Sequence, residues 1–255
     1  MPNKKFLSKS RFKIGHECPR KLYYIEKEEY PNVNLDNAFL EALAEGGFQV
    51  GAMARILHPG GIEIETLDKE EAIQKTSELM SQENAIIFEG AFRFQNLFIR
   101  ADIVEKRGRN IVLSEVKAKS YDPAADQFYN KTLLKKGVHK INSDWEPYLI
   151  DVAFQAFVIK NAFPELEVTS NLMLANKSVR ASVEGLNQLF LLTQEDGKTA
   201  VRVKAGVTKE SLGVPLLIKL NVQDEVALLH ESQYQEGKSF TEYVTSLSKI
   251  YSEGL

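Results

Sequence analysis

Residues 85–117 read AIIFEGAFRFQNLFIRADIVEKRGRNIVLSEVK and contain three apolar stretches interrupted by polar turns. Gln95-Asn96, between the first two stretches, is a two-residue hairpin signal, and Arg107-Gly-Arg-Asn110 separates the next pair. Such short connections join antiparallel neighbours. The sequence therefore predicts three consecutive strands, over residues 85–94, 97–105 and 111–117.

Helical and extended patterns surround these three strands. We expect further strands over residues 62–66 and 167–175, and a hairpin that pairs residues 189–193 with 200–204. We expect helices over residues 8–27, 35–57, 68–81, 147–162, 213–231 and 239–252. The order helix, hairpin, strand, helix, strand predicts an α/β protein in which helices flank a mixed central β-sheet.

The 255 residues are enough for a single domain, with a core over about residues 34–175 and a C-terminal strand-helix extension over about residues 185–255. Residues 120–146 are polar and rich in lysine, so we expect a long loop or mobile insertion that lies over the functional site. No apolar run approaches the roughly 20 residues that cross a bilayer. No stretch typical of a signal peptide follows the N-terminus. We therefore expect a cytoplasmic protein without a membrane partner.

Cys18 is the only cysteine, and the net charge of the chain is −3. A single cysteine excludes an intrachain disulfide and any multi-cysteine zinc or iron–sulfur site made by this chain alone. The histidines show no metal-ligand spacing. Because multi-cysteine sites are excluded, any metal ion must be held by oxygen or imidazole ligands.

Residues 111–117 end in a pattern that predicts a site. Alternate residues of a strand share a face, so Glu115 and Lys117 point the same way. Asp102 interrupts an apolar run on the preceding strand, and antiparallel pairing can bring it close to Glu115. Two carboxylates about 4 Å apart repel by roughly 4 kcal/mol at an effective dielectric of about 20. A divalent cation reverses this repulsion, and magnesium accepts one or two carboxylates together with water and phosphate oxygens.

Each of these features also has an ordinary structural explanation. A Glu-x-Lys pair on a strand is often a surface ion pair, and a single Asp on a strand usually faces water. Two basic clusters, which include Lys9 and Arg11 in one and Lys131, Lys135 and Lys136 in the other, are either solvated surfaces or contacts for a DNA phosphate backbone.

The order of several motifs resembles that of RecB-family nucleases within the PD-(D/E)xK superfamily. The motifs are Ile-Phe-Glu89-Gly, Arg-Ala-Asp102-Ile, Glu115-Val-Lys117 and Asp-Val-Ala-Phe-Gln155. The resemblance implies a restriction-endonuclease-like core and hydrolysis of DNA phosphodiester bonds with Mg²⁺ or Mn²⁺. Asp102 and Glu115 would be metal ligands, and Lys117 would be the catalytic base. Glu89 would add a third acidic group, and Gln155 would lie on the helix that flanks the site.

The opening Leu7–Tyr24 also resembles the N-terminus of the CRISPR-associated exonuclease branch, so that the resemblance covers about residues 7–160. Three departures stand out. Gly51 occupies the place of the family's active-site histidine, and Ile159 that of a tyrosine. Cys18 stands where relatives have the first ligand of an iron–sulfur cluster. The other three cysteines are absent, so the cluster is lost or the chain is a fragment that needs a further domain or subunit.

The function we expect is a DNA nuclease acting in repair, recombination or defence. A catalytically silent nucleic-acid-binding protein of the same fold is the alternative, and a protein whose Asp102 and Glu115 only form surface ion pairs is a third reading. Asp151 and Gln155 lie one helical turn apart and can both approach the metal site. The choices between exonuclease and endonuclease, DNA and RNA, and single- and double-stranded substrate stay open at this point.

Overall fold

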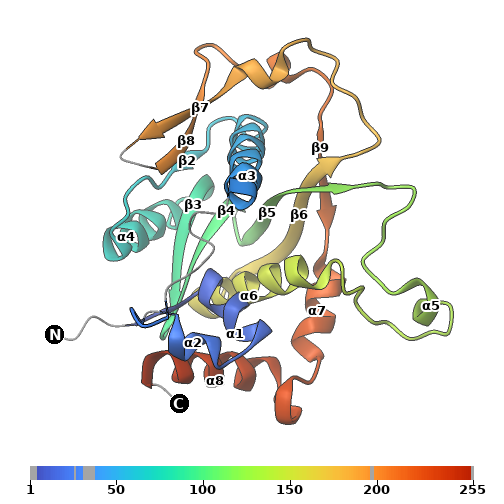
Figure 1. The fold of residues 1–255 in the computed structure, drawn as a ribbon. Helices are drawn as coiled ribbons and strands as arrows, with labels where there is room; N and C mark the ends of the chain where they lie inside the picture. The colour runs from blue at the N-terminus through green and yellow to red at the C-terminus, as the bar shows by residue number, and fades with distance from the viewer. Residues whose placement is uncertain (1–4, 26, 31–37, 196–197, 254–255) are drawn as a thin grey trace.

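The centre of the computed structural model, which describes residues 5–25, 27–30, 38–195 and 198–253, is a seven-stranded sheet (Figure 1). Its order is β2-β3-β4-β5-β6-β9, and β1 pairs with β4. β3, β4 and β5 are antiparallel neighbours and β5 and β6 are parallel, so the sheet is mixed. β7 and β8 form a separate sheet. The strands are β1 Leu7–Ser8, β2 Ile62–Glu63, β3 Asn84–Phe94, β4 Leu97–Arg107, β5 Asn110–Tyr121, β6 Glu167–Asn176, β7 Phe190–Glu195, β8 Lys198–Val203 and β9 Leu217–Asn221.

Helices flank the central sheet. α6 contacts β3, β4 and β6 as well as α1 and α7, whereas α3 contacts β5 and the β7–β8 hairpin (Figure 1). None of the helices in the described part of the chain is long and apolar enough to cross a membrane. The helices are α1 Lys9–Glu17, α2 Lys21–Tyr24, α3 Ala38–Ile56, α4 Lys69–Met80, α5 Lys131–Leu134, α6 Glu146–Ala162, α7 Gln223–Glu231 and α8 Phe240–Glu253.

α6 lies in the core although it carries two polar residues on one face. Its apolar side chains are buried all round the helix axis, as is typical of a helix enclosed by other elements. Phe154 stacks on Phe12 of α1 with ring centroids 4.2 Å apart. Asp151 and Gln155 are also buried, and a polar group in such a place needs a polar partner. This requirement directs both side chains toward the site described below.

The three predicted central strands are confirmed as β3, β4 and β5, and the predicted coarse architecture, a mixed sheet flanked by helices, is confirmed as well. The predicted helix over residues 8–27 is interrupted at Cys18. Its backbone is extended (φ −161°, ψ 112°), which is the conformation favoured before a proline such as Pro19. The predicted strand over residues 62–66 is limited to Ile62–Glu63.

The prediction of a helix over residues 213–231 is wrong in its first half. Leu217–Asn221 form β9 at the edge of the sheet, and α7 begins only at Gln223. β9 is antiparallel to β6, which satisfies the backbone groups on the side of β9 that faces β6. That partner is distant in the sequence, so the local apolar pattern could not reveal it. The start of the predicted helix over residues 35–57 lies outside the described residues, and α3 is described from Ala38.

Residues 122–145 form a long loop broken only by the short α5, as predicted, but the predicted position over the site is wrong, because none of residues 120–146 lines the cavity described below. Phe128, Ile141 and Trp145 are buried and join the main core, and Tyr129 forms a β-bridge with Ile141. These apolar anchors fix the segment against the body of the protein. The short α5 projects away from α1 and α3, at the edge of the molecule (Figure 1).

Candidate active site

The sheet forks where the predicted acidic residues lie. The ladder between β4 and β5 runs from the turn to the pair Ile103↔Ser114 and is not continued to Asp102 and Glu115 in the described residues. Instead, one carboxylate oxygen of Asp102 accepts a hydrogen bond from the backbone N–H of Val116 at 2.7 Å. The side chain of Asp102 is thereby fixed at the mouth of the fork.

β3 is distorted at the same level. Glu89 has a φ of 54°, in the left-handed region, while the residues on either side of it pair regularly with β4. A non-glycine residue in this conformation costs on the order of 1–3 kcal/mol and is typical of functional sites. The Glu89 carboxylate lies 3.9 Å from Arg100. Three neighbouring strands thus each place an acidic residue at the fork.

Two lysines bind these carboxylates. The Nζ of Lys117 contacts Glu115 on its own strand and lies 2.9 Å from Asp151 of α6. The Nζ of Lys9 donates to both oxygens of Glu115, at 3.0 and 3.1 Å, and lies 3.6 Å from Asp102. Lys9 is the first residue of α1, whose N-terminus is capped by the side chain of Ser8. This cap fixes the helix end that carries Lys9.

α6 forms the wall behind Glu115. The amide nitrogen of Gln155 donates to Glu115 at 2.8 Å, and the Nζ of Lys13 lies 3.8 Å from Asp151. One carboxylate oxygen of Asp151 and the amide oxygen of Gln155 are buried without a hydrogen-bond partner among the described residues. A buried acceptor without a donor costs about 1–3 kcal/mol. The site therefore offers acceptor capacity that the described protein groups do not use.

The surroundings move the two central carboxyl groups in opposite directions. Burial favours the neutral form of Glu115, but the ammonium groups of Lys9 and Lys117 outweigh burial and hold the pKa of Glu115 well below its usual range. Burial and the negative charge of Glu115 raise the pKa of Asp102 to about 7. Glu115 is therefore charged at neutral pH, while Asp102 exchanges a proton there.

The amines respond to the same charges. Burial opposes the charged form of Lys9 and of Lys117, yet the carboxylates around them, Glu115 foremost, raise the pKa of both amines above the usual value. Burial and the charge of Glu115 raise the pKa of Asp151, against the attraction of Lys117. Burial also raises the pKa of Glu89. Because the pKa values of Lys9 and Lys117 are raised, both side chains are ammonium ions at neutral pH.

A cavity of about 340 Å³ opens from these groups to the surface. Gly51 of α3 borders it, and a methyl group added there would meet no atom of the described residues within 4 Å. The position that departs from the nuclease pattern therefore lies at a part of the cavity that no described side chain fills. The lining residues are Lys9, Gly47, Phe48, Gly51, Arg55, Glu89, Asp102, Ile103, Glu115, Val116 and Lys117.

The structure thus brings together five predicted residues, namely Glu89, Asp102, Glu115, Lys117 and Gln155. Lys9 was predicted as a contact for a DNA phosphate, and the structure places it within the acidic site, on Glu115. Arg11 instead lies 5.9 Å from the ring of Tyr251. The second basic cluster, Lys131, Lys135 and Lys136, does not line the cavity. The role of these three lysines in nucleic-acid binding stays a prediction.

The sequence did not reveal the contribution of α1. Lys9 and Lys13 are four residues apart and so lie on one helical face, which is a signal that the sequence contains. This spacing alone could not assign the two lysines to the site, because local periodicity does not say which element a helical face packs against. The contacts of α1 with α6 decide this.

Asp102 and Glu115 have the donor chemistry of a magnesium or manganese site. Both cations prefer carboxylate oxygens, and Mg²⁺ takes only one or two of them from a protein. Within the described ranges, no group of three or more acidic, histidine or cysteine side chains is arranged to hold a metal ion. The ammonium of Lys9 lies against both carboxylates. A divalent cation on this pair therefore has to displace it.

No model of a known protein family matches the chain, and no curated protein sequence is similar to it. The functional conclusion therefore depends on the geometry and chemistry of the site.

Proposed function

We propose that this protein is a metal-dependent nuclease of the PD-(D/E)xK type, with a restriction-endonuclease-like core, which hydrolyses DNA phosphodiester bonds. The observation that carries the proposal is the convergence of Asp102, Glu115 and Lys117 at a fork of the sheet, beside an open cavity. Glu115 is buried and Asp102 is partly buried beside it, an arrangement that disfavours folding unless cations compensate the charges, as Lys9 and Lys117 do here. Such an arrangement is more easily explained by chemistry than by stability.

In this proposal Asp102 and Glu115 hold Mg²⁺ or Mn²⁺. When bound, the cation supplies a Lewis acid for the scissile phosphate and lowers the pKa of a coordinated water. Gln155 holds one oxygen of Glu115 through its amide and so fixes the orientation of that carboxylate. Asp151 holds the amine of Lys117 from the side of α6.

The role of Lys117 follows from its charge. Its raised pKa makes it an ammonium in the metal-free protein, and an ammonium cannot accept a proton. It is suited to orient the attacking water and to offset negative charge on the phosphate in the transition state. Action as a general base first requires loss of its proton, which a cation on Glu115 would favour by neutralising the charge that raises the pKa.

A catalytically silent nucleic-acid-binding protein is the second candidate, and two observations favour it. The Lys9 ammonium already compensates Glu115 and lies close to Asp102, so the two acids are stable without a metal ion. Gly51 stands where the nuclease pattern has a histidine, so the cavity lacks the polar side chain that this pattern would place there. In this case DNA would bind without being cut.

Single-turnover cleavage of end-labelled DNA with Mg²⁺ or Mn²⁺ separates the two candidates. The nuclease should cut, and Asp102→Asn should slow cutting by orders of magnitude while DNA binding is retained, because only a ligand charge is lost. Asp144→Asn, at an exposed position outside the cavity, is the matched control and should cut normally. Wild-type protein that binds DNA but cuts neither single strands nor duplexes with either metal would favour the silent protein.

A further inference from the structure

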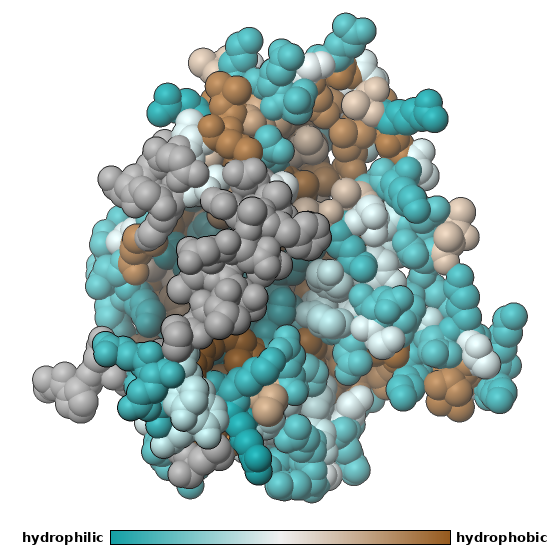
Figure 2. Space-filling view, in the orientation of Figure 1, coloured by the Kyte–Doolittle hydropathy of each residue, from teal (hydrophilic) through white to brown (hydrophobic). Residues whose placement is uncertain are grey.

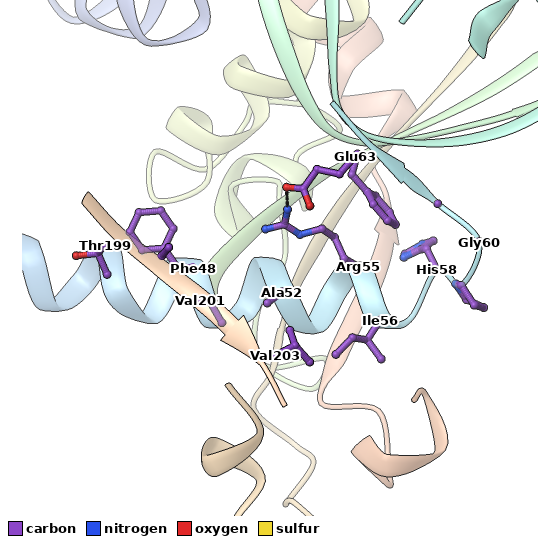
Figure 3. Close-up of a pocket in the computed structure, with 14 residues that line it drawn as sticks. Phe48, Ala52, Arg55, Ile56, His58, Gly60, Glu63, Thr199, Val201 and Val203 are labelled. Carbon is purple, nitrogen blue, oxygen red and sulfur yellow. Dashed lines mark hydrogen bonds and ion pairs between the residues drawn. The ribbon is translucent and has the colours of Figure 1, made fainter. Parts of the chain in front are cut away.

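Arg55 of α3 lines the site cavity and uses little of its hydrogen-bonding capacity there. It also lines a second, adjoining cavity of about 620 Å³, where its side chain extends toward β2 (Figure 3). One of its Nη atoms contacts Glu63 of β2, its hydrogen-bond partner among the described residues. A guanidinium has five N–H donors in a planar fork that fits phosphate oxygens. The donors that Glu63 does not take are available to an anion.

Glu63 holds this guanidinium at the level of the acidic fork. β2 is parallel to β3, and Glu63 pairs with Phe88, which directly precedes Glu89. Burial raises the pKa of Glu89, and nearby positive charges, including that of Arg55, oppose the rise, so the two groups are close enough to interact. Gly51 lies one helical turn before Arg55, on the same face of α3, and also lines the site cavity. The cavity is therefore open along this face of the helix.

The other cations near the fork are already engaged. The ammonium groups of Lys9 and Lys117, which also line the site cavity, both contact Glu115. Arg100 donates to two backbone carbonyl groups and lines neither cavity. On the surface over α3, β7 and β8, apolar side chains gather (Figure 2). Among the described lysine and arginine side chains that line the two cavities, Arg55 is thus the one that does not contact a proposed metal ligand.

Stability gives little reason for an arginine at this position. The side chains of Arg55 and Glu63 are 31% and 41% exposed, and an exposed ion pair contributes little to the stability of a fold. A charged side chain that is held beside a cavity, without being needed for stability, is suited to bind a ligand. Substitution of Arg55 should accordingly leave the fold intact.

We propose that Arg55 is a catalytic residue of the site, which donates to an oxygen of the phosphate that is cut, and that Glu63 is its positioning residue. The inference rests on the proposed nuclease function and adds a group that receives charge in the transition state. In the hydrolysis, the water oxygen bonds to phosphorus and the bond to the leaving oxygen breaks. One water proton ends on the leaving oxygen and the other on the new phosphate monoester. Negative charge on the phosphate oxygens is stabilised by a guanidinium that is fixed before the reaction.

The test measures the chemical step separately from binding, by single-turnover cleavage of end-labelled DNA with Mg²⁺ at saturating protein. Arg55→Ala should slow this step by about 100- to 1,000-fold, the usual loss when one donor to a transition-state charge is removed. Added guanidinium chloride, far below the concentrations that unfold proteins, should restore part of the rate, whereas sodium chloride at equal ionic strength should not. Arg93→Ala is the matched control, because it removes an exposed arginine that pairs with Glu70 outside both cavities.

Two further variants separate charge, geometry and position. Arg55→Lys keeps the charge but lacks the planar fork, so it should recover only part of the rate lost in Arg55→Ala. Glu63→Gln weakens the hold on the guanidinium and should cause a smaller loss than Arg55→Ala. Added guanidinium should not restore the rate of Glu63→Gln, because Arg55 still occupies the space. Thermal unfolding verifies that each variant is folded.

The outcomes distinguish this inference from the proposed function. Slow cleavage in Arg55→Ala that guanidinium partly restores supports the inference. Cleavage by Arg55→Ala at the wild-type rate, or a loss that neither guanidinium nor Arg55→Lys reduces, overturns the inference and leaves the nuclease proposal intact. Wild-type protein that cuts no DNA contradicts the nuclease proposal and, with it, the catalytic role of Arg55.

Discussion

Lys9→Met should increase the affinity of the site for Mn²⁺. The Lys9 ammonium lies 3.0 Å from one oxygen of Glu115, and at this distance the attraction is about 5 kcal/mol at an effective dielectric of about 20. A divalent ion about 4 Å from an ammonium is repelled by roughly 8 kcal/mol under the same assumption. Most of this repulsion disappears when the flexible lysine moves aside. The remainder should still tighten Mn²⁺ binding by about tenfold or more in the variant.

The same substitution should destabilise the metal-free protein. Glu115 is fully buried, and removal of one partner from a buried charge pair costs about 3–5 kcal/mol. Isothermal titration with Mn²⁺ measures the affinity, and thermal unfolding with and without Mn²⁺ measures the stability. Lys13→Met is the control, because Lys13 lies on the same helix but contacts Asp151 rather than the acid pair. Equal Mn²⁺ affinity in Lys9→Met and wild type would refute the view that Lys9 and the metal compete.

Three further perturbations separate chemistry, protonation and binding. Lys117→Ala should abolish cleavage in single-turnover assays but leave Mn²⁺ binding measurable by titration, because an ammonium is not a metal ligand; cleavage at the wild-type rate would exclude a catalytic role. Burial and the charge of Glu115 raise the pKa of Asp102 to about 7, so a proton competes with the metal ion for this carboxylate. Titration calorimetry should therefore show a Mn²⁺ affinity that rises about tenfold per pH unit below about pH 7 and is constant above it. Asp102→Asn should lack this slope, and an unchanged slope would contradict the assignment. Replacement by glutamine of the three lysines around α5, namely Lys131, Lys135 and Lys136, should weaken DNA binding and make its salt dependence shallower. Single-turnover cleavage of bound DNA should stay intact. An unchanged salt dependence of binding would show that these lysines do not contact DNA.

The central strands could be predicted because their signals are local. The alternation in residues 111–117 places Glu115 and Lys117 on one face, and the two hairpin signals determine which strands are neighbours. The proximity of Asp102 to Glu115 follows from this pairing. The place of Gln155 beside the site was expected from the resemblance to RecB-family motifs, and the helical spacing predicted only that Asp151 and Gln155 share a face.

The remaining features depend on contacts between distant parts of the chain. β9 is a strand because β6 is available to it, and Lys9 belongs to the site because α1 packs on α6. The fork in the sheet, with the strained backbone of Glu89, arises where pairing is interrupted, and no residue pattern marks an interruption of this kind. The position of the loop over residues 120–146 was mispredicted because a few buried side chains, among them Phe128 and Trp145, fix it to the core despite its polar composition.

Anomalous diffraction from crystals soaked in Mn²⁺ tests most directly whether Asp102 and Glu115 form a metal site. We expect a peak between the two carboxylates and a Lys9 ammonium moved away from Glu115. In Asp102→Asn crystals soaked in the same way, the peak should be lost or much weaker. Wild-type crystals without a peak at saturating Mn²⁺, in which Lys9 still contacts Glu115, would contradict the metal-dependent mechanism.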